Sequence, residues 1–230
     1  ISYVEAAALP VNYLTAWFCL FDMGHLKRDE KVLIQCGAGG VGTAAIQLAR
    51  EVGATIFATA GSDEKVAFLK EAGVDVPINY MRVKFDAEIR ERIGERGLDL
   101  VLDAVGGDTL RRGYELLAPL GRLVSYGLSD AVAGPRRSLR KAASAWWKTP
   151  RFSPLSLIER NVGVWGFHLA LLRGREDRIA AAMREVVERV EAGRLKPVIA
   201  RTFPLTARGA ADAHRFIHER RNIGKVLLEG

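Results

Sequence analysis

Short hydrophobic runs alternate with helix-like stretches along the chain from residue 31 onward. Unbroken apolar runs of this length are typical of buried parallel strands, and apolar residues three or four positions apart are typical of helices packed on one face. The predicted strands are 31–35, 54–60, 76–79, 98–105, 122–126 and 162–167, and the predicted helices are 41–52, 63–72, 86–93, 109–117 and 176–191. This alternation predicts right-handed β-α-β units, and therefore an α/β fold with a doubly wound parallel sheet of the Rossmann type.

Two parts of the chain depart from this alternation. Residues 127–161 contain several prolines, a basic cluster and the pair Trp146-Trp147, and we interpret them as an insertion with one helix, because such long connections are usually functional or mobile. The last stretch, 198–230, has a strand, helix (206–221), strand pattern of its own. We therefore expect a nucleotide-binding domain over 1–197 and a separate segment over 198–230.

A glycine-rich turn joins the first predicted strand to the first predicted helix. Its sequence, Gly37-Ala38-Gly39-Gly40-Val41-Gly42, matches G-x-G-x-x-G between a strand and a helix, as the motif requires. In that motif the first glycine allows a tight turn, the second lets the backbone approach a pyrophosphate, and the third lets helix and strand pack closely. The helix N-terminus adds free N–H groups and a partial positive charge. The motif in this context predicts dinucleotide binding, with a glycine-rich packing turn as the alternative.

The end of the second predicted strand bears on which dinucleotide binds. An NAD site normally carries Asp or Glu there for the ribose hydroxyl, but this strand ends in Gly61 and Ser62, with Lys65 one helical turn later. Ser62 and Lys65 suit a 2′-phosphate, so NADP(H) is preferred over NAD(H). Ser62 is also a natural helix N-cap, and Asp63 or Glu64 would restore an acidic reader if the alignment slipped by two residues.

Composition and charge narrow the remaining possibilities. The 230 residues contain 49% hydrophobic residues but no apolar run long enough to span a membrane. Two cysteines, Cys19 and Cys36, are too few for a disulfide framework, which favours a reducing, cytoplasmic location. The net charge of +7 is spread along the chain and mixed with acidic residues, so nucleic acid is not an expected partner. The exception is the cluster Arg136, Arg137, Arg140 and Lys141, interpreted as a solvated helix face, a contact for phosphate or an acidic substrate, or a nucleic-acid patch, in that order.

The sequence does not predict a metal site or a nucleophile. His214 and His218 share a helix face but lack the glutamate of a zinc-binding H-E-x-x-H motif, so a surface pair is the better interpretation. Asp99 and Asp103 lie in a strand, where we expect capping or turn roles. Ser2 and Glu5 form a predicted capping box that begins a helix, and this start without an initiator Met led us to expect a truncated chain.

Several motifs together resemble the medium-chain dehydrogenase/reductase superfamily, specifically its zinc-free quinone oxidoreductase branch. In order they are EAAALPVNYLTA (5–16), AGGVG (38–42), INY (78–80), DAVGG (103–107), GRLVSYG (121–127) and GKVLL (224–228). The stretches GPRR (134–137), WW (146–147) and WGFH (165–168) are most similar to homologues of the synaptic vesicle amine-transport protein within that branch. The resemblance covers nearly the whole chain.

The resemblance implies a role for each of a set of residues. Thr15 would face the nicotinamide or pyrophosphate, Gly39 to Gly42 would hold the pyrophosphate, and Ser62, Lys65 and Tyr80 would surround the 2′-phosphate. The nicotinamide end would be lined by Ser125, Tyr126, Gly127, Phe167 and Leu169, and approached from the tail by Asn222 and Lys225. Val11 stands where zinc-dependent relatives carry a cysteine ligand, so the resemblance implies a site without zinc.

The resemblance also implies that a second domain of the family lies outside this chain. Family members carry an N-terminal GroES-like β-barrel domain that supplies much of the substrate pocket, and 198–230 would be the segment that returns to complete it. We therefore expect a partial remnant of that domain here, little catalysis by this chain alone, and a homodimer through the edge of the nucleotide-binding sheet.

The leading functional hypothesis is NADPH-dependent hydride transfer to a quinone or an α,β-unsaturated carbonyl. Solvent or the Tyr13 hydroxyl is the candidate proton donor, with core packing the favoured role for Tyr13. The alternative is a protein that senses nucleotides or binds a membrane surface on the same fold, with the basic cluster and Trp146-Trp147 contacting anionic lipid.

Overall fold

The computed structural model describes residues 1–128 and 150–230, and its centre is a six-stranded parallel sheet with the order β3-β2-β1-β4-β5-β6. This order is that of a Rossmann sheet, with the order reversing between β1 and β4. The predicted α/β, doubly wound fold is confirmed. The strands are β1 (Lys31–Ile34), β2 (Thr55–Ala60), β3 (Val76–Asn79), β4 (Leu98–Asp103), β5 (Leu117–Ser125) and β6 (Gly163–Gly166).

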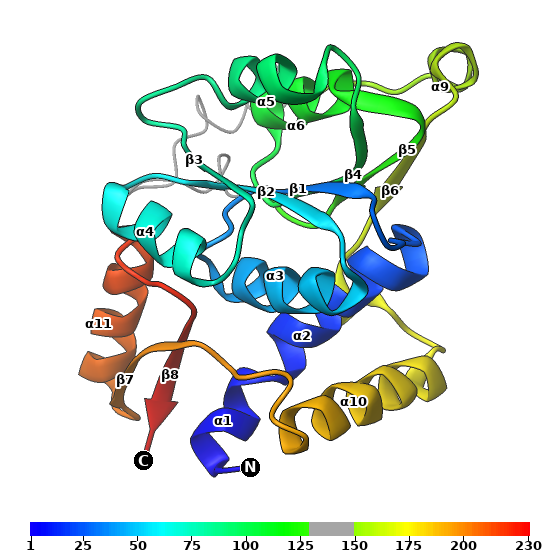
Figure 1. Ribbon diagram of the computed structural model, residues 1–230. Coiled ribbons are helices and arrows are strands. Elements are labelled where there is room, and N and C mark those ends of the chain that lie inside the picture. Colours follow the sequence, from blue (N-terminus) through cyan, green and yellow to red (C-terminus); the bar gives the residue numbers. More distant parts are fainter. Residues whose placement is uncertain (129–149) are drawn as a thin grey trace.

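Helices cover both faces of this sheet, as Figure 1 shows. On one face α3 (Gly40–Val52) and α4 (Asp63–Glu71) pack with α2 (Pro10–Trp17) and α10 (Glu176–Glu191). On the other lie α5 (Phe85–Ile93) and α6 (Gly107–Glu115), with α9 (Pro154–Arg160) beyond them. The two cores use alternate residues of the strands: Ile34 and Ile56 face α3, whereas Leu33 and Phe57 face α5. Strand residues are therefore apolar in succession, because both faces are buried.

The N-terminal region contains more helix than the sequence pattern predicted. Ser2 and Glu5 form the expected capping box at the start of α1 (Tyr3–Ala8). Helix α2 follows directly, with Pro10 in its first turn, where its missing N–H is no loss. It continues into a π-helical turn, Phe18–Met23, that brings the ring of Phe18 to 5.5 Å from the ring of Phe167.

One predicted boundary is wrong. The pattern placed residues 109–117 in a helix and began the next strand at Arg122, but α6 ends at Glu115 and β5 already begins at Leu117. Leu117 is fully buried and pairs with Leu98, and the register then shifts so that Arg122 pairs with Leu100. Pro119, interpreted as a helix stop, lies within this irregular part of β5. Long-range pairing outweighed the local helical pattern there.

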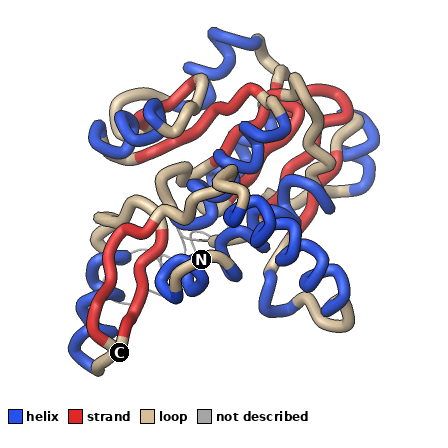
Figure 2. Tube along the Cα trace, turned by 60° about the horizontal axis from the view of Figure 1, so that its bottom comes forward, coloured by secondary structure: helices blue, strands red, loops and turns tan. Residues whose placement is uncertain are grey.

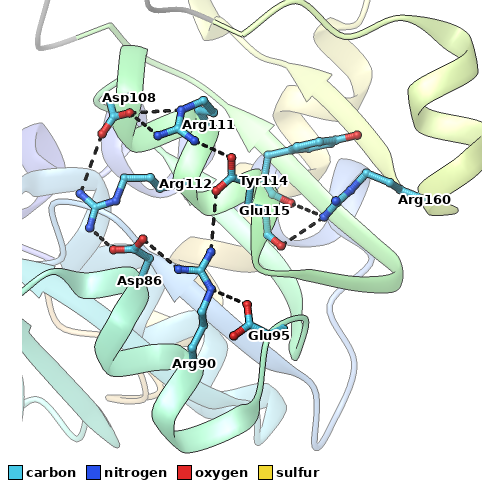
Figure 3. A network of polar contacts seen from close by, with 9 residues as sticks. All are labelled: Asp86, Arg90, Glu95, Asp108, Arg111, Arg112, Tyr114, Glu115 and Arg160. Atoms are coloured by element: carbon cyan, nitrogen blue, oxygen red, sulfur yellow. Dashed lines mark hydrogen bonds and ion pairs between the residues drawn. The ribbon is translucent and has the colours of Figure 1, made fainter.

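A network of charged side chains joins the two helices on the α5–α6 face, shown in Figure 3. Asp86 accepts hydrogen bonds from Arg112 and, at 3.0 Å, from Arg90, and Arg90 also pairs with Glu95 and Glu115. At the end of the network, Arg160 of α9 donates to the carbonyl oxygens of Tyr114 and Glu115. These contacts fix α9, the described helix of the predicted insertion, against the sheet layer. The basic cluster and Trp146-Trp147 lie outside the described residues.

The tail forms a small unit apart from the main sheet. Strands β7 (Ile199–Pro204) and β8 (Lys225–Glu229) pair in parallel, with α11 (Ala207–His218) between them in sequence and against them in space. Figure 2 shows this two-stranded ribbon projecting from the body of the molecule, and Figure 1 shows both termini on this side. The strand, helix, strand pattern predicted for 198–230 is confirmed.

Candidate functional site at the carboxyl edge of the sheet

The glycine-rich turn lies between β1 and α3, where the motif placed it. Helix α3 begins at Gly40 with Gly39 as N-cap, and no side chain caps this end. The first N–H groups of a helix have no acceptor within it, so those of Gly40, Val41 and Gly42 face outward at the carboxyl end of β1. This is the arrangement that binds phosphate at a helix N-terminus.

The glycines of the turn differ in what a side chain at each position would contact. A Cβ on Gly42 would lie 2.6 Å from the carbonyl oxygen of Gly37, so helix and strand can pack only around a glycine. A Cβ on Gly37 would lie 2.9 Å from Cβ of Ala58, whereas the left-handed residue of this turn is Cys36, with φ of +56°. Gly37 is therefore required by crowding rather than by backbone conformation. A Cβ on Gly39 would meet only the carbonyl oxygen of Cys36, at 3.2 Å, which leaves an open side for a ligand.

Asn12 belongs to this turn, although the sequence reading did not single it out. Its side chain is buried, and its Nδ2 atom is 2.5 Å from where a Cβ on Gly40 would stand. The asparagine thus sits directly against the start of α3, and Gly40 makes this close approach possible. The motif gives no signal for such a contact, because the two residues are 28 positions apart.

Ser62 and Asp63, at the end of β2, are arranged as a helix start. The Ser62 side chain caps α4 by accepting from the N–H of Lys65 at 3.3 Å, as the N-cap interpretation expected. Asp63 is held by other residues: Asn79 donates to it at 2.8 Å, and Arg82 forms a hydrogen-bonded ion pair with it. Asp63, one of the two acidic residues that would have favoured NAD(H), is thus engaged at the end of β3.

Two cations meet beside Tyr80. The ammonium of Lys65 donates to the backbone carbonyl of Arg220 at 2.5 Å, and the Arg220 guanidinium donates to the Tyr80 hydroxyl at 3.3 Å. Partial burial lowers the pKa of Lys65, with a smaller contribution from the Arg220 charge. Within residues 1–128 and 150–230, neither cation has a carboxylate at ion-pair distance. The Glu64 carboxylate acts on Lys65 only from beyond ion-pair distance, so two positive charges without a directly paired carboxylate lie at this place, which suits an anion.

Arg220 was missed by the sequence reading. It lies in the connection between α11 and β8, 155 residues from Lys65, with φ of +55°. The tail brings it there because Gly224 donates to the carbonyl of Ala38 at 2.9 Å and bridges to Gly39. Asn222 is placed by its hydrogen bond to the carbonyl of Gly224 at 3.0 Å, and Lys225 by its N–H bond to Val198 at 2.8 Å. The two predicted tail residues therefore flank the contact with the glycine-rich turn.

The residues predicted for the nicotinamide end lie where β5 and β6 finish. Ser125 is the last residue of β5, and its carbonyl accepts from the N–H of Phe167 at 2.9 Å. Gly127 packs on the Asp103–Ala104 turn, since a Cβ there would be 2.9 Å from the carbonyl of Ala104. Thr15 is buried on α2, the helix that lies against the 3-10 turn Leu169–Leu171.

Tyr13 is a core residue in this structure. It is 2% exposed, and burial raises the pKa of its hydroxyl to about 12. It belongs to the core cluster on the α2–α3 side of the sheet, and the Gln47 side chain of α3 opposes part of the pKa rise of its hydroxyl. The core-packing alternative therefore describes its position, and proton donation by Tyr13 stays a prediction.

No group of three or more His, Cys, Asp or Glu side chains that could hold a metal ion is found in the described parts of the chain. His214 and His218 lie on the exposed side of α11 with ring centroids 6.5 Å apart, as the surface-pair interpretation expected. None of the described helices is long and apolar enough to cross a membrane. A hollow of about 240 Å³ lies between β7 and α11, away from the glycine-rich turn. The candidate nucleotide site is therefore identified by the residues at the strand ends and by their charges, and not by this hollow.

The sequence matches a known family model and several curated proteins. The family model described as zinc-binding dehydrogenase matches residues 40–187. The chain is 43% identical over 228 residues to a synaptic vesicle membrane protein VAT-1 homolog of Danio rerio, covering 99% of this chain and 46% of that protein. It thus spans about half the length of the curated relatives it matches.

Two solved structures share the fold. A quinone oxidoreductase from Thermus thermophilus, studied also as its complex with NADPH, has a TM-score of 0.78 and 33% identity, covering all of this chain and 67% of that one. The CurK enoyl reductase has a TM-score of 0.79 and 29% identity, covering all of this chain and 64% of that one.

Proposed function

The chain belongs to the zinc-binding dehydrogenase family of the medium-chain dehydrogenase/reductase superfamily, and we propose that it is the nucleotide-binding part of an NADPH-dependent oxidoreductase. The acceptor we propose is a quinone or an α,β-unsaturated carbonyl. The observation that carries the proposal is the pair of uncompensated cations, Lys65 and Arg220, beside Tyr80 at the end of β2. A 2′-phosphate distinguishes NADPH from NADH, and this is the part of the site that would bind it.

The other residues fit the remaining parts of the cofactor. The open side of Gly39 and the free N–H groups at the start of α3, including those of Val41 and Gly42, would hold the pyrophosphate. Gly61 must lack a side chain because Tyr80 lies against it. Thr15, Ser125, Tyr126, Gly127, Phe167 and Leu169 would line the nicotinamide end, with Asn222 and Lys225 near the turn.

The reduced nicotinamide would supply the hydride, and the protein's part is to hold and orient it and to exclude water. Phe18 and Phe167, in ring contact, form an apolar wall beside the strand ends that suits this task. The enoyl reductase and quinone oxidoreductase structures with the same fold support an acceptor of conjugated type. We also propose that the site works without zinc, supported by Val11 in place of a cysteine ligand and by an acceptor conjugated enough to need no metal.

The whole protein would contain a second domain that this chain lacks. Supporting this, the chain covers 46% to 58% of its vesicle-protein relatives, and apolar side chains such as Tyr3 and Leu228 are exposed around α1 and β8. We propose that β7, α11 and β8 complete that domain. We propose further a homodimer through the edge strand β6, whose Trp165 is half exposed, and a cytoplasmic location, in keeping with two free cysteines.

Calorimetric titration of this chain with NADPH and NADH tests the cofactor assignment. We expect Lys65→Ala and Arg220→Ala each to weaken NADPH binding by about ten- to a hundredfold, as loss of one charged hydrogen bond implies, and to leave NADH binding nearly unchanged. Lys70→Ala, an exposed lysine on the same helix, is the control and should change neither affinity. Equal affinity for both cofactors in the native chain, unaffected by Lys65→Ala, would refute the 2′-phosphate assignment.

A second candidate function is contact with a membrane surface, favoured by the vesicle-membrane names of relatives about 40% identical. Co-sedimentation with vesicles containing phosphatidylserine tests it. Binding that is lost when Arg136, Arg137, Arg140 and Lys141 are neutralised would support this function, and no binding to such vesicles would argue against it.

A further inference from the structure

Asp103 is the last residue of β4, beside the point where the strand order reverses. Its side chain is fully buried. One carboxylate oxygen, Oδ1, accepts from the N–H of Val105 at 3.0 Å and from that of Gly106 at 2.6 Å. The other oxygen, Oδ2, has no hydrogen-bond partner in the described structure. A buried carboxylate oxygen without a hydrogen-bond partner destabilises the folded state, so a functional role for Asp103 is worth considering.

The carboxylate fixes an unusual turn. Gly106 and Gly107 both have positive φ, +82° and +54°, and they begin α6 without any side-chain cap at Gly106. The carboxylate of Asp103 accepts from the N–H of Gly106, the N-cap residue, which is the contact that the N3 side chain makes in a capping box. Without this acceptor, two consecutive left-handed glycines would leave the turn poorly determined.

The same residue also holds the end of β5. The carbonyl of Asp103 accepts from the N–H of Tyr126 at 2.9 Å, and Gly127 packs against Ala104 without room for a side chain. The turn after β4 and the segment 125–127 therefore form one unit, with Asp103 as the residue bonded to both. That segment is the one assigned above to the nicotinamide end of the cofactor.

We propose that Asp103 is a positioning residue: its carboxylate holds the 103–107 turn, against which the 125–127 segment is bonded and packed, in the shape that receives the nicotinamide half of NADPH. The inference rests on the proposed function. It concerns the nicotinamide half alone, so the 2′-phosphate end at Lys65 and Arg220 is independent of it.

The pH dependence of cofactor binding distinguishes this role from a purely structural one, because it follows the ionisation of the Asp103 carboxylate. Burial raises the pKa of Asp103 to about 6, against the opposing hydrogen bonds from Gly106 and Val105. The titratable groups facing it are Cys36 at the end of β1, with its pKa raised to about 11 by burial and by the Asp103 charge, and Tyr126, with its pKa raised well above the ordinary value by burial. Both stay neutral from pH 5 to 8. An ionised carboxylate accepts hydrogen bonds more strongly than a protonated one, so the unit loosens as the pH falls through about 6.

The test compares two ligands by calorimetry. NADPH and 2′-phospho-ADP-ribose share the adenosine 2′-phosphate and the pyrophosphate, so the ratio of their affinities reports what the nicotinamide adds, without a second phosphate monoester that would titrate near pH 6. With a pKa of about 6, Asp103 is nearly all ionised at pH 7.5 and about one-quarter ionised at pH 5.5, so we expect this ratio to fall about fourfold between the two. In Asp103→Asn the charge is absent, and the ratio should be low at pH 7.5 and change less between the two pH values.

Asp99→Asn is the matched control. Asp99 lies near the start of β4 and accepts from the N–H of Lys31 at 2.7 Å, at the opposite end of the same strand. This variant should keep the affinity ratio and pH dependence of the native chain. A ratio that responds identically to pH in the native chain and in Asp103→Asn overturns the proposal, and if Asp103→Asn does not fold, a native ratio that is flat with pH overturns it as well. Binding of 2′-phospho-ADP-ribose with no gain for NADPH overturns this inference alone, whereas failure of both ligands to bind overturns the proposed function too.

Discussion

Replacing Asp86 by Asn should destabilise the chain through the network on the α5–α6 face. Asp86 is 14% exposed in its side chain and is bound by both Arg112 and Arg90 (Figure 3). Burial by itself would raise its pKa, but the hydrogen bond and charge of Arg112, helped by Arg90, lower it to about 2 from the ordinary 3.8. The amide of Asn keeps the shape of the side chain and removes the charge.

The pKa shift sets an upper limit for the effect. The lowering of the Asp86 pKa from 3.8 to about 2 corresponds to at most about 2 kcal/mol of folding free energy, and solvent screening at the partly open edge of the network reduces this to about 1–2 kcal/mol. Because the folded-state pKa lies below the unfolded one, this stabilisation is complete above about pH 4 and is lost as the pH falls through about 2.

Urea unfolding followed by circular dichroism at pH 7 measures this quantity. Asp108→Asn is the control, since Asp108 belongs to the same network but is 55% exposed and should contribute less than about 0.5 kcal/mol. The difference between native chain and Asp86→Asn should also shrink from pH 4 downward. Equal stabilities of the Asp86 and Asp108 variants at pH 7 would refute the reasoning, as would a difference that persists unchanged at pH 2.

Two further predictions concern other parts of the fold. Gly42→Ala should lower the free energy of unfolding by about 1–3 kcal/mol because its Cβ has no room, whereas Gly39→Ala should lower it less and mainly weaken NADPH binding. Thermal unfolding and calorimetry on both variants check this, and equal destabilisation by the two substitutions would contradict it. Arg122→Met should lower the free energy of unfolding by about 2–4 kcal/mol, because the guanidinium pairs with Glu30 and donates to the carbonyl oxygens of Gly24, His25 and Asp99. Urea unfolding measures this change, and a loss below about 1 kcal/mol would show that these contacts do not stabilise the fold.

The features that the sequence predicted correctly are those that depend on neighbouring residues. Strands buried on both faces leave apolar runs, and helices packed on one face leave a three-to-four-residue period, so the β-α-β order could be predicted from residue 31 onward. Ser2 and Ser62 were recognisable as caps, because an N-cap serine bonds to an N–H only three residues away. The glycine-rich turn was recognisable in part for the same reason, since the atoms that crowd Gly39 and Gly42 belong to Cys36 and Gly37 of the turn itself, whereas Gly40 is crowded by the distant Asn12.

The features that were missed or wrong depend on residues far apart in the chain. Leu117 has a helical pattern around it, but its pairing with Leu98 places it in a strand. The motif assigned the tight turn to its first glycine, Gly37, but the residue with the positive φ in this turn is Cys36. Arg220 reaches Tyr80 only because Gly224 is bonded to the turn at Ala38.

The sequence by itself therefore determined the fold class and the dinucleotide motif, and it left open whether Asp63 or Glu64 acts as an acidic reader at the end of β2. The tertiary structure alone decided which charges are uncompensated. It directs Asp63 to Asn79 and Arg82, and it brings Arg220 beside Lys65. The physical reason is that periodicity and capping record only interactions over a few residues. The charge balance of the site depends on contacts between segments up to 155 residues apart.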